Sequence, residues 1–339
     1  MRTQPASQVV KLLVSIVFLS TMIACQPSGG QSTDAPQQTA DASISQDVAN
    51  HIQAGNQYID QGEYDLAIEE FNQAARLDPE NDEVRRRRGV AYGHKNEYDL
   101  AMADYNKAIE LNPNDGKAYN NRGLVYEFYY KDYERALADY NKAIELSPDL
   151  ELAYYNRAGY YFNRGEYTLS IADFTKAIEL DPNDMPAYIN RGNAYNESGE
   201  YDKAIADYNQ GLQINSEDKL LNYIYYNRGV AYKNKGEYEK AAEDFTKVTE
   251  LDPYDTIALL NLGIINDALG EFEKAIADYS KVIELLPDES KVYYYRGNDY
   301  LEIGQKDEAI ADFKKVVEMN SDPDLVKDAQ EALSKLGEQ

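Results

Sequence analysis

Residues 118–126 (AYNNRGLVY), 187–195 (AYINRGNAY) and 224–232 (IYYNRGVAY) are three copies of one short pattern, and this pattern decides the fold. Each copy is followed by close variants of Gly-Glu-Tyr, of Ala-x-x-Asp before an aromatic residue, and of Lys-Ala-Ile-Glu-Leu. Prolines mostly 34 or 35 residues apart follow these segments, at Pro79, Pro113, Pro148, Pro182, Pro253 and Pro287. Repetition at a fixed period indicates an array of similar units. The chain of 339 residues therefore holds one array and not the two domains that length alone suggests.

Three positions of the unit explain how two helices could pack within it. The first segment carries a small residue at Gly55, Gly89, Gly123, Ala158, Gly192, Gly229, Gly263 and Gly297. The second carries another at Ala67, Ala101, Ala136, Ser170, Ala204, Ala241, Ala275 and Ala309. Four residues later come Phe71, Tyr105, Tyr140, Phe174, Tyr208, Phe245, Tyr279 and Phe313. Small residues allow helices to approach closely, and a residue four positions on lies on the same helical face. Proline ends each unit because it cannot continue a helix.

This pattern resembles the tetratricopeptide repeat, a helix–turn–helix unit of about 34 residues. The resemblance implies an all-α fold, an α-solenoid of eight repeats over residues 48–321. The expected repeats are 48–81, 82–115, 116–150, 151–184, 185–221, 222–255, 256–289 and 290–321. An amphipathic segment at 323–336 should form a C-terminal capping helix. Two irregularities are expected: one extra residue between the helices of the third repeat, within 128–133, and about three near 219–221 in the fifth.

The first 47 residues are predicted to be a targeting signal followed by a tether. Residues 12–24 are apolar but number only 13, fewer than the ~20 that cross a bilayer as a helix. They end in Met22-Ile23-Ala24-Cys25, which resembles the lipobox of bacterial lipoproteins and implies a signal peptide over 1–24 and lipidation of Cys25. The alternative is an incidental thiol after an ordinary signal peptide. Residues 25–47, rich in Ser, Gln, Gly, Pro and Asp, are expected to be a disordered tether.

The resemblance also implies that the first helix of each repeat lines a concave groove. Two residues before the recurring small residue, five successive repeats carry asparagine: Asn121, Asn156, Asn190, Asn227 and Asn261. Side-chain amides both donate and accept hydrogen bonds, so such a row could hold an extended peptide backbone. Asn193 is added to this candidate groove in the fifth repeat. The alternative is that the row recurs by repeat duplication, or that its amides bond a neighbouring helix.

Tyrosines and arginines beside this row are further candidates. Tyr155, Tyr226 and Tyr294 could offer rings to a ligand, or could pack between helices. Arg86 and Arg87 are expected to face the groove and resemble part of a carboxylate clamp, the alternative being a solvated basic patch. A recurring arginine before the glycine and a recurring aspartate before the aromatic residue favour a structural ladder of ion pairs between helices over partner binding.

Composition and charge narrow the classes of function and of partner that are expected for this chain. The chain has 34 Lys+Arg against 60 Asp+Glu, a formal charge of −26, which disfavours nucleic acid as a partner. One Cys and two His, without a phosphate loop or nucleophile elbow, predict neither an enzyme nor a metal site, and no cofactor is expected. We expect a lipid-anchored scaffold of the bacterial cell envelope, facing the periplasm or exterior, that binds a peptide or protein segment in its groove. The alternative is a structural component of an envelope, secretion or pilus complex that self-associates.

Overall fold

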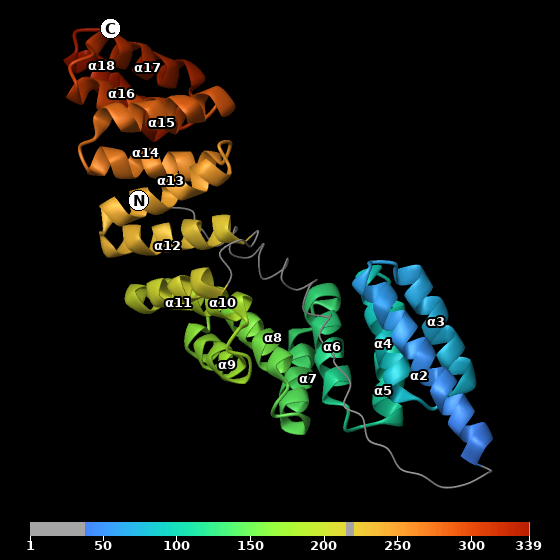
Figure 1. Cartoon of the computed structure of the whole chain (residues 1–339). Helices are drawn as coiled ribbons and strands as arrows, with labels where there is room; N and C mark the ends of the chain where they lie inside the picture. Colours follow the sequence, from blue (N-terminus) through green and yellow to red (C-terminus); the bar gives the residue numbers. More distant parts are fainter. Residues whose placement is uncertain (1–37, 215–219, 339) are drawn as a thin grey trace. The chain divides into compact units, whose positions relative to one another are not determined.

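The computed structural model describes residues 38–214 and 220–338 (Figure 1). The predicted signal peptide, Cys25 and residues 25–37 of the predicted tether lie outside the described residues. Every regular element described is helical, which confirms the all-α class. The chain divides after Ala194 into two compact units. None of the described helices is both long enough and apolar enough to span a bilayer.

Two helices form each of the repeats, as predicted. The first helices are α2 (Gln38–Asp60), α4 (Asp82–His94), α6 (Gly116–Val125), α8 (Glu151–Phe162), α10 (Met185–Glu197), α12 (Leu221–Lys235), α14 (Thr256–Ala268) and α16 (Ser290–Glu302). The second helices are α3 (Tyr64–Leu77), α5 (Tyr98–Leu111), α7 (Tyr133–Leu146), α9 (Tyr167–Leu180), α11 (Tyr201–Ile214), α13 (Tyr238–Leu251), α15 (Phe272–Leu285) and α17 (Lys306–Met319). Within each unit, consecutive helices pack side by side (Figure 1).

The recurring glycine and aromatic residue form the contact between the two helices of a repeat. A Cβ atom added to Gly89 would lie 2.6 Å from the ring of Tyr105, and one added to Gly263 would lie 2.6 Å from the ring of Tyr279. Tyr105 is fully buried and Tyr279 is only 1% exposed. The ring therefore occupies the space that a side chain on the first helix would need. The predicted small-residue packing is confirmed.

The extra residue of the third repeat is accommodated inside a helix. The first helix continues from α6 into a π-helical turn, η2 (Tyr126–Tyr130), and Lys131 then adopts a left-handed φ of 57°. A π-helical turn accommodates one additional residue within a helix, which is how it absorbs the insertion. Glu127 lies buried in this turn and accepts a hydrogen bond of 2.9 Å from the Tyr140 hydroxyl.

The N-terminal end of the array differs from the expectation, whereas the C-terminal end agrees with it. Helix α2 begins at Gln38, so the prediction that residues 38–47 belong to a disordered tether was wrong. Val48, 5% exposed, anchors the helix to the core, and upstream residues then extend it at one hydrogen bond per residue ordered. At the other end, α18 (Pro323–Lys335) packs on α16 and α17, burying Ala329 and Leu333 against the core. It forms the expected cap.

The irregular fifth repeat falls partly outside the described residues. Its predicted insertion near residues 219–221 begins at the end of the segment 215–219, which is not described. The following helix, α12, begins at Leu221, one residue before the repeat boundary predicted at 222.

Candidate functional site

The recurring arginines and aspartates form ion pairs between the two helices of a repeat, which confirms the predicted structural ladder. Their N–O distances are 2.6–2.8 Å in Arg88–Asp104, Arg122–Asp139, Arg157–Asp173, Arg228–Asp244 and Arg296–Asp312. Both carboxylate oxygens accept from the guanidinium in each pair, as in the bonds of 2.8 Å between Arg122 and Asp139. We call these five pairs the arginine ladder. Burial raises the pKa of Asp139 and Asp244 even though each faces a guanidinium.

Each arginine of the ladder also reaches the preceding repeat. A further N–H donates to the residue that follows the buried aromatic residue of the preceding second helix: Asn72, Asn106, Asn141, Asn209 or Ser280. Four of the guanidinium groups also lie over tyrosine rings three positions before and four positions after the arginine. The ladder therefore ties three helices together.

Most of the predicted asparagine row lies beneath the surface. In the first unit the Nδ2 of Asn156 donates to Asn120 Oδ1 at 2.9 Å, and that of Asn190 donates to the Tyr155 hydroxyl at 2.6 Å. In the second unit, Asn227 donates to its own helix, at the carbonyl of Tyr223. Asn156, Asn190 and Asn227 are 3–4% exposed, so their contacts favour the alternative of bonding between and within helices.

The remaining members of the candidate groove differ in accessibility. Asn193 is 3% exposed, whereas Asn121 and Asn261 are half-buried. Tyr155 and Tyr226 are buried and pack edge-on against Phe174 and Phe245, with ring centroids 5.5 Å apart in each pair. The half-buried Tyr294 packs on Phe313 at 5.8 Å. Peptide binding by this set stays a prediction.

The basic pair of the second repeat is engaged with its own unit. Arg86 is 8% exposed and forms an ion pair of 2.8 Å with Asp115, the N-cap of α6. Arg87 pairs with Glu83 at 2.6 Å and donates to Asn56 Oδ1 at 2.8 Å. These contacts stabilise the first three helical pairs, and clamping of a carboxylate by either side chain stays a prediction.

An exposed stripe on α14, in the second unit, adds two isoleucines that sequence reasoning missed to the predicted Asn261. Ile257 is 48% exposed and Ile264 is 36% exposed, and the half-buried Asn261 lies between them. Spacings of four and three residues place the three on one face, opposite the buried Leu259 and Leu262. The Asn261 Oδ1 accepts from Lys233 Nζ at 2.6 Å, and its Nδ2 donates to the Ile257 carbonyl. We call Ile257, Asn261 and Ile264 the α14 stripe.

Buried carboxyl groups in both units have raised pKa values. Burial, and then the neighbouring Asp184, raises the pKa of Glu151 to about 8. Burial, and then Asp267, raises the pKa of Asp299 to about 8, and burial raises that of Glu127 to about 7. Asp299 is only 2% exposed. Among the residues that the structure describes, no group of three His, Cys, Asp or Glu side chains could hold a metal ion.

Asp299→Asn is expected to stabilise the protein at pH 8 and to change little at pH 4. A carboxyl whose pKa is raised on folding favours the folded state while protonated, and this contribution is lost as the pH rises toward about 8. The melting temperature of the wild type should therefore fall between pH 5 and pH 8, and the melting temperature of the Asp299→Asn variant should fall less. Thermal unfolding at both pH values measures this. The exposed Asp288→Asn should follow the wild type, and equal falls in all three proteins would contradict the assignment.

Comparisons with known proteins agree with the helical pairs. Profiles described as tetratricopeptide repeat match residues 83–115, 152–184, 186–218, 223–255, 256–289 and 290–323, and another matches 104–138. A profile described as TPR repeat matches residues 55–96. No curated protein matches the chain.

Solved structures share the fold at low identity. The C-terminal part of a TPR repeat-containing protein from Cytophaga hutchinsonii is 22% identical, with a TM-score of 0.60, over 71% of this chain and 98% of that one. PilF of Pseudomonas aeruginosa is 20% identical, with a TM-score of 0.55, over 62% and 94%. YrrB, a TPR protein with an unusual peptide-binding site, is 23% identical, with a TM-score of 0.50, over 57% and 97%. Profile matches over more than half of its length, on the helical pairs just described, show that the chain belongs to the tetratricopeptide repeat family.

Proposed function

We propose that the protein is a scaffold that binds an extended segment of a partner protein along the first helices of its repeats, without catalysing a reaction. Tetratricopeptide repeat domains bind protein or peptide partners, and YrrB is described as having a peptide-binding site. The α14 stripe carries the proposal for this chain, because it exposes two isoleucines around an amide on a first helix. Apolar side chains supply contact area, and the amide can bond a peptide backbone.

Charge indicates the kind of segment that would bind. The chain carries a formal charge of −26, so complementary partners are neutral or basic, and like-charged ones are disfavoured. Self-association is the alternative function, and exposed tyrosines on a terminal repeat would favour it. Among the described residues, the exposed tyrosines lie instead in the third and sixth repeats, at Tyr129, Tyr130, Tyr133, Tyr238 and Tyr254. Because these tyrosines do not lie on a terminal repeat, and because the α14 stripe is exposed, partner binding is favoured over self-association.

Site-specific crosslinking in cells tests the groove. A photoreactive residue at Ala268, the exposed end of α14, should crosslink a partner in the full-length protein. The Ile257→Ser/Ile264→Ser variant should lower affinity by about tenfold, because both side chains lose apolar contact, and the crosslink yield should fall accordingly. Leu100→Ser, 49% exposed on α5 in the other unit, is the matched control. An unchanged yield in the double variant would refute binding at the α14 stripe.

We propose further that the scaffold is a lipoprotein anchored in the cell envelope through Cys25. The apolar run 12–24 directly before the one cysteine of the chain supports this. Metabolic labelling with a fatty-acid analogue should mark the wild type and not Cys25→Ser, and cell fractionation should move the variant out of the membrane. A variant that stays fully membrane-bound would refute anchoring through Cys25. It would not bear on the proposed peptide-binding groove.

A further inference from the structure

The arginine ladder is interrupted in the seventh repeat, on α14. In the third, fourth, sixth and eighth repeats the arginine lies between tyrosines at positions −3 and +4, as Arg228 lies between Tyr225 and Tyr232. At the equivalent positions the seventh repeat has Leu259, Leu262 and Asn266. Its first helix therefore supplies neither the guanidinium nor the rings that cover one.

The acceptors that the missing arginine would bind are still present. Asp278 occupies the ladder position on α15 and is 8% exposed. Its Oδ2 accepts from Asn266 Nδ2 at 2.9 Å, while its Oδ1 accepts no hydrogen bond from the described residues. Thr246 on α13 occupies the position that Asn209 and Ser280 occupy at their rungs of the ladder. Its hydroxyl donates to the Ala242 carbonyl at 2.7 Å, which leaves its oxygen able to accept.

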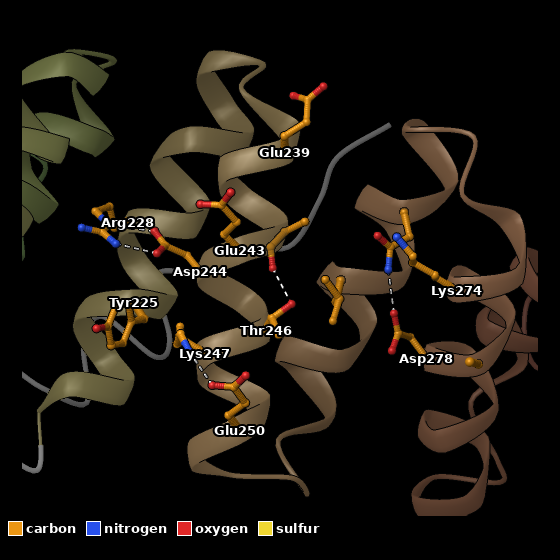
Figure 2. Close-up of a pocket in the computed structure, with 14 residues that line it drawn as sticks. Tyr225, Arg228, Glu239, Glu243, Asp244, Thr246, Lys247, Glu250, Lys274 and Asp278 are labelled. Atoms are coloured by element: carbon orange, nitrogen blue, oxygen red, sulfur yellow. Dashed lines mark hydrogen bonds and ion pairs between the residues drawn. The ribbon is translucent and has the colours of Figure 1, made fainter.

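A cavity of about 840 Å³ opens over these acceptors (Figure 2). Most of its lining comes from α13 and α15, and α12 and α14 contribute the remaining residues. Figure 2 shows Thr246, Glu243 and Glu239 along α13 and Asp278 on α15, with all four lining this space. All of these residues belong to the second unit.

The charge of the lining favours a cation. Five carboxylates line the cavity against three basic side chains, Arg228, Lys247 and Lys274. Each of the basic side chains already has a carboxylate partner at 2.6–2.7 Å, respectively Asp244, Glu250 and Glu271. Within the described residues, none of the other three carboxylates, Glu239, Glu243 and Asp278, forms an ion pair. An incoming cation would therefore meet acceptors that are not already neutralised.

We propose that this cavity binds an arginine side chain of a partner protein, which completes the interrupted ladder in trans. The five intact pairs show what such a side chain does here: it donates to the aspartate of one second helix and to the polar residue of the preceding one. Lysine fits less well, because a compact ammonium cannot donate along two directions in one plane. The cavity is larger than one guanidinium needs, so it can also hold residues that flank the arginine, which favours a protein segment over a free cation.

This site differs from the α14 stripe. Ile257 and Ile264 lie on the exposed face of α14, whereas Leu262 is 8% exposed and belongs to a core cluster with residues of α12 and α13. Variants of the two surfaces can therefore be tested separately.

A nuclear magnetic resonance titration of the full-length protein with two blocked tripeptides tests the inference. The probes are acetyl-Gly-Arg-Gly-amide and acetyl-Gly-Lys-Gly-amide, which carry the same charge. We expect the arginine peptide to bind about tenfold more tightly, because only its guanidinium can bond Asp278 and Thr246 together. Leu262→Arg should abolish its binding by placing a guanidinium in the cavity from within the chain, as the arginines of the ladder do in their own repeats.

Two further variants keep the outcome interpretable if Leu262→Arg does not fold, which circular dichroism would show. Asp278→Asn should weaken binding of the arginine peptide about tenfold with little change in shape. Glu273→Gln removes the same charge from an exposed position of α15 that does not line the cavity, and it should leave binding nearly unchanged. Equal affinity for the two peptides, or equal effects of the Asp278 and Glu273 variants, would overturn the proposal and indicate non-specific attraction to an acidic surface.

Discussion

Tyr279→Ala is expected to lower the free energy of unfolding of the repeats around it by about 3–5 kcal/mol. The ring is 1% exposed and fills the space above Gly263, where an added Cβ atom would lie 2.6 Å away. Its removal leaves a cavity between α14 and α15 that a backbone held by neighbouring repeats cannot close fully.

Urea unfolding together with amide hydrogen exchange measures this effect. Repeat arrays are stabilised by neighbour contacts and can lose their cooperativity, so exchange on α14 and α15 locates the loss. Tyr254→Ala is the matched control, since that side chain is 75% exposed and its loss should cost little. A loss of less than about 1 kcal/mol for Tyr279→Ala would contradict the role of the ring.

Arg228→Met is expected to cost about 3–5 kcal/mol, because it leaves Asp244 buried without its cation. Asp244 is 3% exposed and receives hydrogen bonds of 2.8 and 2.6 Å from Arg228. Arg228 also donates to Asn209, so the same substitution weakens the contact between α11 and α12. Methionine retains the apolar stem of the side chain, which limits the change to the charged group.

A double variant separates the charge from the packing. Arg228→Met/Asp244→Leu should recover most of the lost stability, since replacing both members of a buried pair by apolar residues is often nearly neutral. Lys240→Met breaks an exposed pair with Glu237 and should change the stability little, because solvent screens that pair. Urea midpoints for the four proteins test this, and a double variant as unstable as the single one would show that the buried carboxylate is not the cause.

Repetition made the intra-repeat contacts predictable. Gly263 and Tyr279, or Arg228 and Asp244, recur at the same spacing in other repeats, so their spacing alone identifies them as pairs. Such contacts form within one helical pair and depend little on how repeats stack. The helix boundaries are similarly local, because prolines and turn residues mark them.

Exposure of the first helices was less predictable. Asn156 and Asn261 occupy the same position of the repeat, yet Asn156 is 4% exposed and Asn261 is half-buried. Their environments differ because Asn156 meets Asn120 on the adjacent first helix α6, whereas Asn261 lies between two exposed isoleucines. Ile257 and Ile264 belong to an apolar helix, and apolar composition alone predicts that such residues are core.

The seventh repeat shows the same division between sequence and structure most clearly. From the sequence alone, Leu262 is only a departure from the recurring arginine. In the folded protein, because position 262 holds no arginine, Asp278 and Thr246 line a cavity of about 840 Å³. Sequence by itself determined the repeat, its two helices and the contacts inside each pair, because these depend on residues a few turns apart. Tertiary structure alone decided which side chains of the first helices are accessible, because accessibility depends on how neighbouring repeats pack.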